Sequence, residues 1–188
     1  MKLQIKSFCS IKAGYSFRGQ PVADETGPFY LLQAKDINAF GEIDYHQCIK
    51  ISTDNIKSIT PLSQGEILLT ARGTFKAAIF ESDKPFVTSN AVFIIDVIKP
   101  ACYKPYLAIW LNSPACKKQL EKVTLLSATT PTLPRNALNE LVIDLPSLDT
   151  QKEIVEAYRL NSKQYAISQS IYNLRKMQLE NMMNGAII

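Results

Sequence analysis

The segment 150–183, near the carboxyl end of the chain, contains neither proline nor glycine. Its first residues include Thr150 and Glu153, whose spacing is that of a capping box at the start of a helix. Gly185 stands where a helix commonly ends in the left-handed conformation. A helix over this segment would be about 50 Å long, at roughly 1.5 Å per residue, and a small domain cannot cover that length. We therefore expect a helix that reaches beyond its own domain to a partner.

Apolar side chains on this helix recur every seven residues in two stripes. The first stripe starts at Tyr158 and the second at Leu160, and a separation of two residues places them about 200° apart. An ordinary surface helix needs one apolar face, so two faces predict two neighbours: a partner helix and a second protein surface. The alternative is that one stripe packs on the chain's own domain. The predicted interface residues are Ile154, Tyr158, Leu160, Tyr165, Ile167, Ile171, Tyr172, Leu174 and Leu179.

The rest of the chain alternates between short β-rich runs and turn residues, and its period then changes to that of helices. The expected strands are 29–32, 66–70, 77–80, 91–95 and 141–145, and the expected short helices are 105–111 and 114–123, with Ser113 as the cap of the second. Residues 125–134 are polar and β-branched, and we expect a loop there. The sequence predicts an α+β protein: a mixed, β-rich domain with short helices over 1–148, followed by a long, coiled-coil-type C-terminal α-helix over 149–188.

The composition of this chain of 188 residues argues against a membrane protein and against a protein held together by disulfides. No apolar run reaches the roughly 18–20 residues that span a bilayer, so we expect no membrane association. The four cysteines are widely separated and form no C-x-x-C pair, which is typical of reduced thiols in a cytoplasmic protein. The net charge of +4 permits binding to nucleic acid without arguing strongly for it.

Motifs for catalysis and for metal binding are missing from the sequence. There is no glycine-rich phosphate loop and no G-x-G-x-x-G fingerprint. His46 is the only histidine, which excludes zinc sites built on paired histidines, and no nucleophile elbow accompanies it. We predict a binding protein with no catalytic residue, no metal ligand and no cofactor of its own.

Four segments, taken in order, resemble a known family. They are Gly14-Tyr15-Ser16-Phe17-Arg18-Gly19, Leu31-Leu32-Gln33-Ala34-Lys35-Asp36-Ile37, Gly65 to Gly73, and the junction Leu141 to Val155 that contains Pro146 and Gln151-Lys152-Glu153-Ile154. Together they resemble a target recognition domain with its conserved helix, from the specificity subunit of type I restriction–modification systems. The resemblance covers essentially the whole chain, and the junction is its most specific part.

This resemblance implies a DNA-reading domain over 1–148 and a helix over 149–188 that docks methyltransferase subunits. The usual subunit carries two such domains and two such helices, so this chain is similar to a half-length specificity subunit. Pairing of two copies through their helices would make a homodimer that reads an interrupted palindrome in double-stranded DNA. S-adenosylmethionine and methyl transfer would then belong to the methyltransferase subunits, and cleavage to restriction subunits where these are present.

The candidate DNA contacts are side chains in or beside loops that can reach phosphates or base edges. Arg72 is favoured because Gly73 permits close approach of the backbone and an arginine can bond guanine through two hydrogen bonds. The alternatives are solvated surface charges for the basic residues and local turn bonding for the hydroxyls. The predicted DNA contacts are Arg18, Gln33, Lys35, Arg72, Thr74, Lys76, Ser127, Thr129, Thr130, Thr132 and Arg135.

Two other functions remain open at this stage. The chain could be a regulatory interaction module that binds a methyltransferase subunit through its helix without reading DNA. It could also be an enzyme with an unfamiliar site, although the missing motifs argue against this. Sequence-dependent DNA binding would separate the first function from the proposed reading subunit, and cleavage of DNA by the purified chain would reveal the second.

Overall fold

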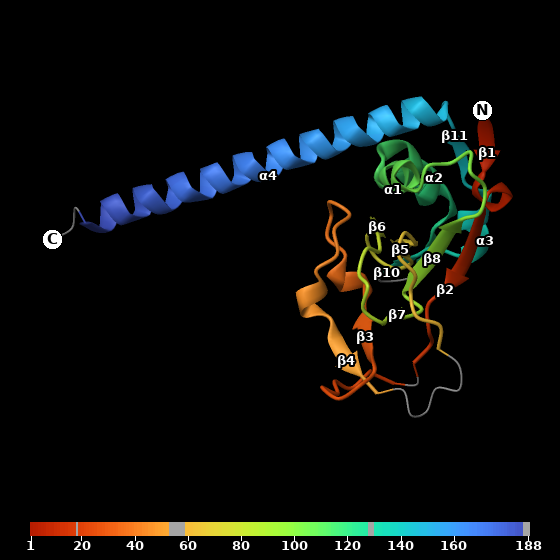
Figure 1. Cartoon of the computed structure of the whole chain (residues 1–188), viewed down its shortest axis with the longest axis horizontal. Coiled ribbons are helices and arrows are strands. Elements are labelled where there is room, and N and C mark those ends of the chain that lie inside the picture. The colour runs from red at the N-terminus through yellow and green to blue at the C-terminus, as the bar shows by residue number, and fades with distance from the viewer. Residues whose placement is uncertain (18, 53–58, 128–129, 186–188) are drawn as a thin grey trace. The chain divides into compact units, whose positions relative to one another are not determined.

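In the computed structural model, residues 1–17, 19–52, 59–127 and 130–185 are described (Figure 1). The chain divides into two compact units, Met1–Gln151 and Lys152–Ile188. The described part of the first unit contains sheets and short helices, and that of the second is helical, so the predicted α+β class is confirmed. No helix within the described ranges combines the length and the apolar character needed to cross a membrane.

The largest sheet in the described residues has four strands in the order β2-β8-β5-β6. They are β2 (Cys9–Ala13), β8 (Val92–Val97), β5 (Ile67–Thr70) and β6 (Ala77–Ile79), and neighbouring strands are antiparallel. Every residue of β5 is buried, as expected for a strand with neighbours on both sides. The sheet therefore places the connection between β5 and β6, which carries Arg72, at one end of its central strand.

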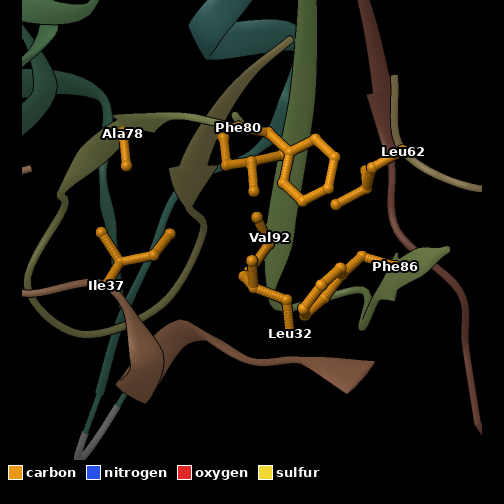
Figure 2. Packing of buried hydrophobic residues seen from close by; sticks show 8 residues of the cluster. Leu32, Ile37, Leu62, Ala78, Phe80, Phe86 and Val92 are labelled. Carbon is orange, nitrogen blue, oxygen red and sulfur yellow. The ribbon is translucent and has the colours of Figure 1, made fainter. Parts of the chain in front are cut away.

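A second sheet has three strands in the order β4-β3-β7. Strand β3 (Phe29–Leu32) runs antiparallel to β4 (Ile49–Ile51) and parallel to β7 (Phe86–Thr88), so the predicted mixed character of the domain is present. Between the two sheets the domain buries a cluster of apolar side chains, which Figure 2 shows converging from β3, β6, β7 and β8 and from the loops beside them. The cluster comprises Leu32, Ile37, Leu62, Leu68, Ala78, Phe80, Phe86 and Val92.

Two further strand pairs are antiparallel: β1 (Lys2–Gln4) with β11 (Val142–Asp144), and β9 (Leu125–Ser127) with β10 (Thr130–Thr132). The second pair shows that the expectation of a loop over 125–134 is wrong. Strand β10 is held on its other side by backbone hydrogen bonds to residues 71–73, and such long-range partners cannot be inferred from local sequence. A short helix, α3 (Arg135–Glu140), follows it and was also not expected.

The helices that were expected in the middle of the chain are present. Helix α1 spans Lys104–Asn112 and α2 spans Pro114–Val123, each with proline in its first turn. The Ser113 hydroxyl accepts a hydrogen bond from the backbone N–H of Cys116 at 3.2 Å, which confirms the predicted cap. Single 3₁₀ turns, η1 (Ile5–Ser7), η2 (Ala34–Asp36) and η3 (Tyr45–Gln47), connect the strands.

Two side-chain amides complete the hydrogen bonding of backbone at sheet edges. Asn112 bonds both backbone groups of Ala77 in β6: its Oδ1 accepts from the N–H at 2.9 Å, and its Nδ2 donates to the carbonyl at 2.8 Å. Gln119 bonds both backbone groups of Val142 in β11: its Oε1 accepts from the N–H at 3.0 Å, and its Nε2 donates to the carbonyl at 2.8 Å. These bonds reproduce the pattern of a β ladder and fix α1 and α2 to different sheets.

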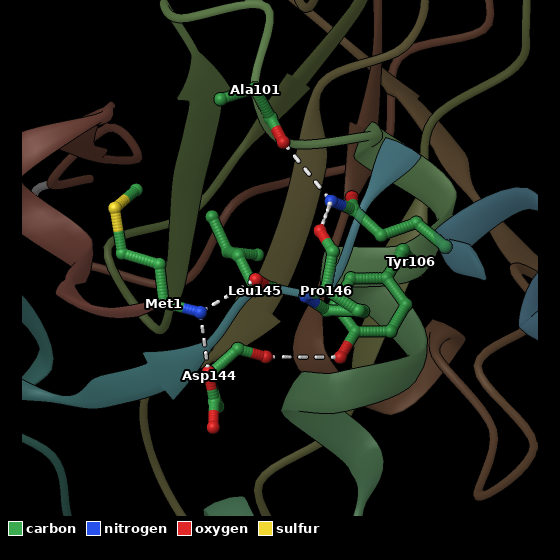
Figure 3. A network of polar contacts seen from close by, with 7 residues as sticks. Met1, Ala101, Tyr106, Asp144, Leu145 and Pro146 are labelled. Atoms are coloured by element: carbon green, nitrogen blue, oxygen red, sulfur yellow. Dashed lines mark hydrogen bonds and ion pairs between the residues drawn. The ribbon is translucent and has the colours of Figure 1, made fainter. Parts of the chain in front are cut away.

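The start of the long helix α4 (Leu148–Gly185) is fixed by a buried glutamine. Gln151 is fully buried, and its Oε1 accepts from the backbone N–H of Tyr103 at 2.8 Å. Its Nε2 donates to the carbonyls of Ala101 and Pro146, both at 3.0 Å (Figure 3). All the bonding capacity of this amide except one acceptor lone pair is used, so the first turn of α4 belongs to the first compact unit.

The residue that caps α4 differs from the expected one. The hydroxyl of Ser147 accepts from the backbone N–H of Thr150 at 3.2 Å and also bonds the Thr150 hydroxyl at 2.9 Å. Ser147 is thus the capping residue, and the expected capping box of Thr150 with Glu153 is wrong. The physical reason is that a hydroxyl three positions earlier, next to Pro146, satisfies the free N–H groups first.

Strand β11 also carries a charged contact at its end. The α-amino group of Met1 donates to the Asp144 carboxylate at 2.7 Å and to the Leu145 carbonyl at 2.9 Å, while the Tyr106 hydroxyl donates to the Asp144 carbonyl at 3.3 Å (Figure 3). The hydrogen bond from the α-amino group, and its positive charge, lower the pKa of the Asp144 carboxyl. Both ends of the first unit therefore meet beside β11.

Candidate nucleic-acid interface

The connection between β5 and β6, residues 71–76, is held in its conformation by hydrogen bonds to the buried hydroxyl of Thr70. Thr70 is 1% exposed, and its Oγ1 donates to the Thr74 carbonyl at 2.7 Å and accepts from the Lys76 N–H at 2.8 Å. The backbone N–H of Thr70 also donates to the Lys76 carbonyl at 3.0 Å. Because the loop is closed on its inner side, the side chains of Arg72 and Thr74 are directed to solvent, and both are exposed.

This loop is joined to strand β10 by backbone hydrogen bonds. Arg72 and Thr132 form an antiparallel bridge, the Gly73 N–H donates to the Pro131 carbonyl at 2.9 Å, and the Leu133 N–H donates to the Ala71 carbonyl at 2.9 Å. Gly73 has a φ of +75°, which glycine adopts without strain. Segments that lie far apart in the sequence are therefore held side by side, and they bring the guanidinium-bearing Arg72 next to the predicted hydroxyl residues.

A third segment is attached through Lys76. The Lys76 ammonium donates to the backbone carbonyl of Ile37, directly after turn η2. That turn is held by the buried carboxylate of Asp36, whose Oδ2 accepts from the backbone N–H of Gln33 at 2.8 Å. Lys35 is exposed at the tip of the turn, and Gln33 is half-buried at its base. We call the three joined segments, 33–37, 71–76 and 130–133, the joined-loop surface.

The joined-loop surface contains most of the predicted DNA contacts that the structure describes. They are Gln33, Lys35, Arg72, Thr74, Lys76, Thr130 and Thr132, and Arg135 is exposed shortly after Thr132 at the start of α3. The ammonium of Lys76 is already bonded to a carbonyl, so its clearest role is to connect two segments. Arg18 and Thr129 lie outside the described residues, as does the side chain of Ser127.

Positive charge on this side of the domain is not neutralised internally. Within the described part of the chain, Arg72, Lys35 and Arg135 form no ion pair. Helix α2 carries three exposed lysines that sequence reasoning did not select, Lys117, Lys118 and Lys122, and Lys117 lines a pocket together with Gly73 and Thr74. Their spacing is that of an ordinary amphipathic helix, so no local signal separated them from a solvated helix face.

The Gly14-Tyr15-Ser16-Phe17 segment has a structural role. A Cβ atom on Gly14 would lie 2.2 Å from the backbone oxygen of Ser89, so only glycine fits where this segment crosses the chain after β7. Tyr15 pairs with Ser89 in a parallel bridge, and its ring meets that of Phe17 edge to face at 5.0 Å. This motif therefore shapes the domain that carries the joined-loop surface.

Chemically, the described residues offer binding groups. Burial raises the pKa of each of the four cysteine thiols to about 12, so they are protonated and weakly nucleophilic at neutral pH. In the described ranges, no group of three or more His, Cys, Asp or Glu side chains could hold a metal ion. What the joined-loop surface presents is a guanidinium, an ammonium and hydroxyls on a rigid backbone, which suits hydrogen bonding to an anionic polymer.

The predicted interface residues lie on α4, and all of them are exposed. Their exposed fractions range from 38% for Tyr158 to 66% for Leu160 and Leu174. Three methionines that were not predicted, Met177, Met182 and Met183, are also at least 59% exposed and extend the apolar surface toward the end of the helix. Together these residues form an extended exposed apolar surface on one helix, which differs from the single exposed apolar residues scattered over an ordinary protein surface.

Comparison with known proteins gives one family and several related structures. Residues 1–176 match the family described as "Type I restriction modification DNA specificity domain". No curated protein matches the chain. A solved structure of a type I R-M system, described for its complex assembly and conformational transition, is similar with a TM-score of 0.73 and 16% identity, over 97% of this chain and 43% of that one.

Two further solved structures are similar in fold. They are the type I restriction-modification S subunit from M. genitalium (TM-score 0.57, 14% identity, 87% of this chain and 39% of that one) and the HsdS subunit from Thermoanaerobacter tengcongensis (TM-score 0.60, 17% identity, 89% and 38%). The chain spans less than half the length of each of these three structures. At such identities the likeness establishes a shared fold.

Proposed function

This chain belongs to the type I restriction modification DNA specificity domain family, and from that membership we propose that it is a DNA-recognition subunit. The joined-loop surface reads the base sequence, and α4 holds the partners of the complex. The observation that carries the proposal is the backbone bridge between Arg72 and Thr132. It holds the exposed Arg72 beside the half-buried Thr132 and close to the exposed Thr130. One surface therefore offers a base-reading group and phosphate-binding groups together.

In this function the chain takes part in recognition and leaves catalysis to other subunits. Double-stranded DNA is the ligand, and methyltransferase subunits with their S-adenosylmethionine perform the methyl transfer. Restriction subunits, where present, cleave the DNA. Support comes from the joined-loop surface, whose guanidinium, ammonium and hydroxyl groups can bind and orient a nucleic acid.

The exposed apolar residues of α4 support a role in assembly. Pairing of two copies through this helix gives a two-fold dimer, whose two joined-loop surfaces read identical half-sites separated by a spacer. Opposed stripes starting at Tyr158 and Leu160 leave one face for the second copy and one for a methyltransferase subunit. The recognised site is then an interrupted palindrome.

A second candidate function follows from the same helix. An interaction module that binds a methyltransferase subunit through α4, without reading DNA, needs only the exposed apolar stripes and would leave Arg72 without a ligand. The two candidates differ in one property: only the recognition subunit gives the complex a preference among DNA sequences.

Genome-wide mapping of methylated bases in cells with and without the chain tests the proposal. We expect a bipartite, palindromic motif to lose its methylation when the chain is deleted and to regain it on complementation. Methylation that persists at the same motif would overturn the recognition function. A complementing variant with Arg72→Ala separates the candidates further, because a pure interaction module would restore methylation as well as the unaltered chain does.

A further inference from the structure

A pocket of about 460 Å³ opens between the 71–76 loop, β10 and helix α2. Its lining is mainly apolar: the ring of Phe75 comes from the loop and Pro131 from β10. Lys117 and Glu121, one helical turn apart, line it from α2. All the lining residues belong to the first compact unit, and Thr74 is the one lining residue that is also among the predicted DNA contacts.

The pocket is directly adjacent to the side chain proposed to read DNA. Gly73 and Thr74, the two residues after Arg72, form part of its wall, and Pro131 precedes the bridge partner Thr132. A duplex contacted by Arg72 therefore has its next base pairs within reach of the pocket. Because Gly73 and Pro131 are joined by a hydrogen bond of 2.9 Å, the wall is built by the same contact that positions Arg72.

The lining of the pocket favours a neutral, apolar group inside it and an anion beside Lys117. Lys117 and Glu121 are both exposed where they line the pocket. The Glu121 carboxylate repels a phosphate, whereas Lys117 forms no ion pair within the described ranges and attracts one. Phe75 and Pro131 have no polar side-chain group, so the interior suits an apolar group. In the major groove of DNA the apolar group on offer is the C5-methyl of thymine.

We propose that this pocket receives the C5-methyl group of a thymine in the recognised DNA. Phe75 and Pro131 contact the methyl group, and Lys117 contacts a neighbouring phosphate. This inference rests on the proposed recognition function and adds a specificity-determining residue, Phe75, to it. It also predicts that the recognised half-site contains at least one thymine close to the base pair that Arg72 contacts.

The test uses the full chain assembled with its methyltransferase subunits and synthetic duplexes that carry the mapped motif. Each thymine of the motif is replaced in turn by uracil, which removes the methyl group and keeps base pairing. One position should lower the affinity about fourfold, the value expected for one buried methyl group, while the other positions change little. Phe75→Ala should bind the thymine and uracil duplexes equally, and Ile98→Ala, an exposed apolar residue at the end of β8, should keep the difference.

The outcomes are distinguishable from failure of the recognition function. An assembly that binds all duplexes alike contradicts recognition itself. Sequence-dependent binding with no uracil-sensitive position, a motif without thymine, or a sensitivity that survives Phe75→Ala overturns the pocket alone. Lys117→Gln provides a second measurement: it should weaken both duplexes equally and reduce the slope of log affinity against log salt by about 0.9, as for one lost phosphate contact. An unchanged slope removes Lys117 from the interface.

Discussion

Arg72 is paired through its backbone with Thr132, a residue of a different hairpin, and the pairing is reinforced by hydrogen bonds at Gly73 and Leu133. The exposed guanidinium is therefore carried by a two-segment scaffold, and a flexible single loop would hold it less firmly. Since rigid placement reduces the entropy lost on binding, the pair is well suited to sequence reading.

Replacing Arg72 with alanine tests that role. If the guanidinium bonds a base edge, DNA binding by the reconstituted methyltransferase should weaken by about 1–3 kcal/mol and lose preference at one position of the site. Binding can be followed by fluorescence anisotropy at physiological salt. Lys99→Ala, which removes an exposed charge at the end of β8, is the control. An affinity for Arg72→Ala equal to that of the control would remove Arg72 from the site.

Gln151→Leu should destabilise the first unit. The substitution leaves the N–H of Tyr103 and the carbonyls of Ala101 and Pro146 without their partner. The three hydrogen bonds are partly buried, and a net hydrogen bond contributes about 1 kcal/mol, so we expect a loss of about 1–3 kcal/mol in the free energy of unfolding. Urea denaturation measures it, with Gln178→Leu, on the exposed part of α4, as the matched control. Equal stability of the two variants would show that the buried amide contributes nothing.

Two glycine substitutions should differ in their cost. A Cβ on Gly14 meets the backbone oxygens of Ser89 and Thr88 at 2.2 Å and 2.5 Å, so Gly14→Ala should cost at least about 3 kcal/mol because the backbone has to move. At Gly73 a Cβ meets nothing within 4 Å, and the φ of +75° alone makes Gly73→Ala unfavourable by about 1–2 kcal/mol. Thermal unfolding of both variants gives the order, and the reverse order would contradict the close approach at Gly14.

From the raised pKa values of the cysteine thiols we predict that the stability of the protein falls at alkaline pH. Burial raises the pKa of each thiol from 9.0 to about 12, so the folded state holds its protons longer than the unfolded state does. The stability from this source is fully present below pH 9 and is lost as the pH rises from 9 toward 12. Thermal unfolding across this range should show the fall, and a variant with all four cysteines replaced by alanine should lose part of it.

The same burial predicts slow reaction of the thiols. Iodoacetamide, followed by mass spectrometry at about pH 8, should modify the folded chain far more slowly than the unfolded chain, because the thiolate is the reactive species. Rapid modification of Cys116, which is fully buried, would contradict the packing around α2.

The apolar surface of α4 should control assembly. Replacing Tyr165, Ile167, Ile171 and Tyr172 together with glutamate removes apolar groups from both stripes and should weaken self-association or docking of methyltransferase subunits. Sedimentation velocity and co-purification measure these two properties. Asn173→Glu, an exposed residue outside both stripes, controls for the added charge. If the quadruple variant keeps both properties, the assembly role of α4 is wrong.

Much of the fold could be predicted from the sequence because its signals are local. Strand β3, helix α2 and its Ser113 cap depend on patterns of consecutive residues, and the structure confirms all three. Strand β10 could not be predicted, since its threonines and Pro131 are held in extended conformation by the distant residues 71–73. The cap of α4 could not be assigned from the sequence because two hydroxyl residues, Ser147 and Thr150, compete for one capping role.

In the candidate site, too, local features could be predicted from the sequence, whereas contacts between distant segments could not. Arg72 could be selected because it is followed by a glycine in a loop, but its position next to Thr132 depends on a contact between distant segments. Lys76 looked like a free basic residue and is instead bonded to the Ile37 carbonyl. Phe75 and Lys117 carry no local signal of DNA contact, because an aromatic residue is typical of a core and a helical lysine of a solvated face, and only the pocket brings them together.

The amide of Asn112 has a consequence for how the chain behaves at high concentration. Strand β6 ends its sheet, and an edge with free N–H and carbonyl groups is a template on which another chain can add a strand and start an aggregate. By bonding both groups of Ala77, Asn112 occupies the place that a foreign strand would take. We therefore expect this side chain of helix α1 to oppose the addition of a strand at β6, which glycine or alanine in place of Asn112 could not do.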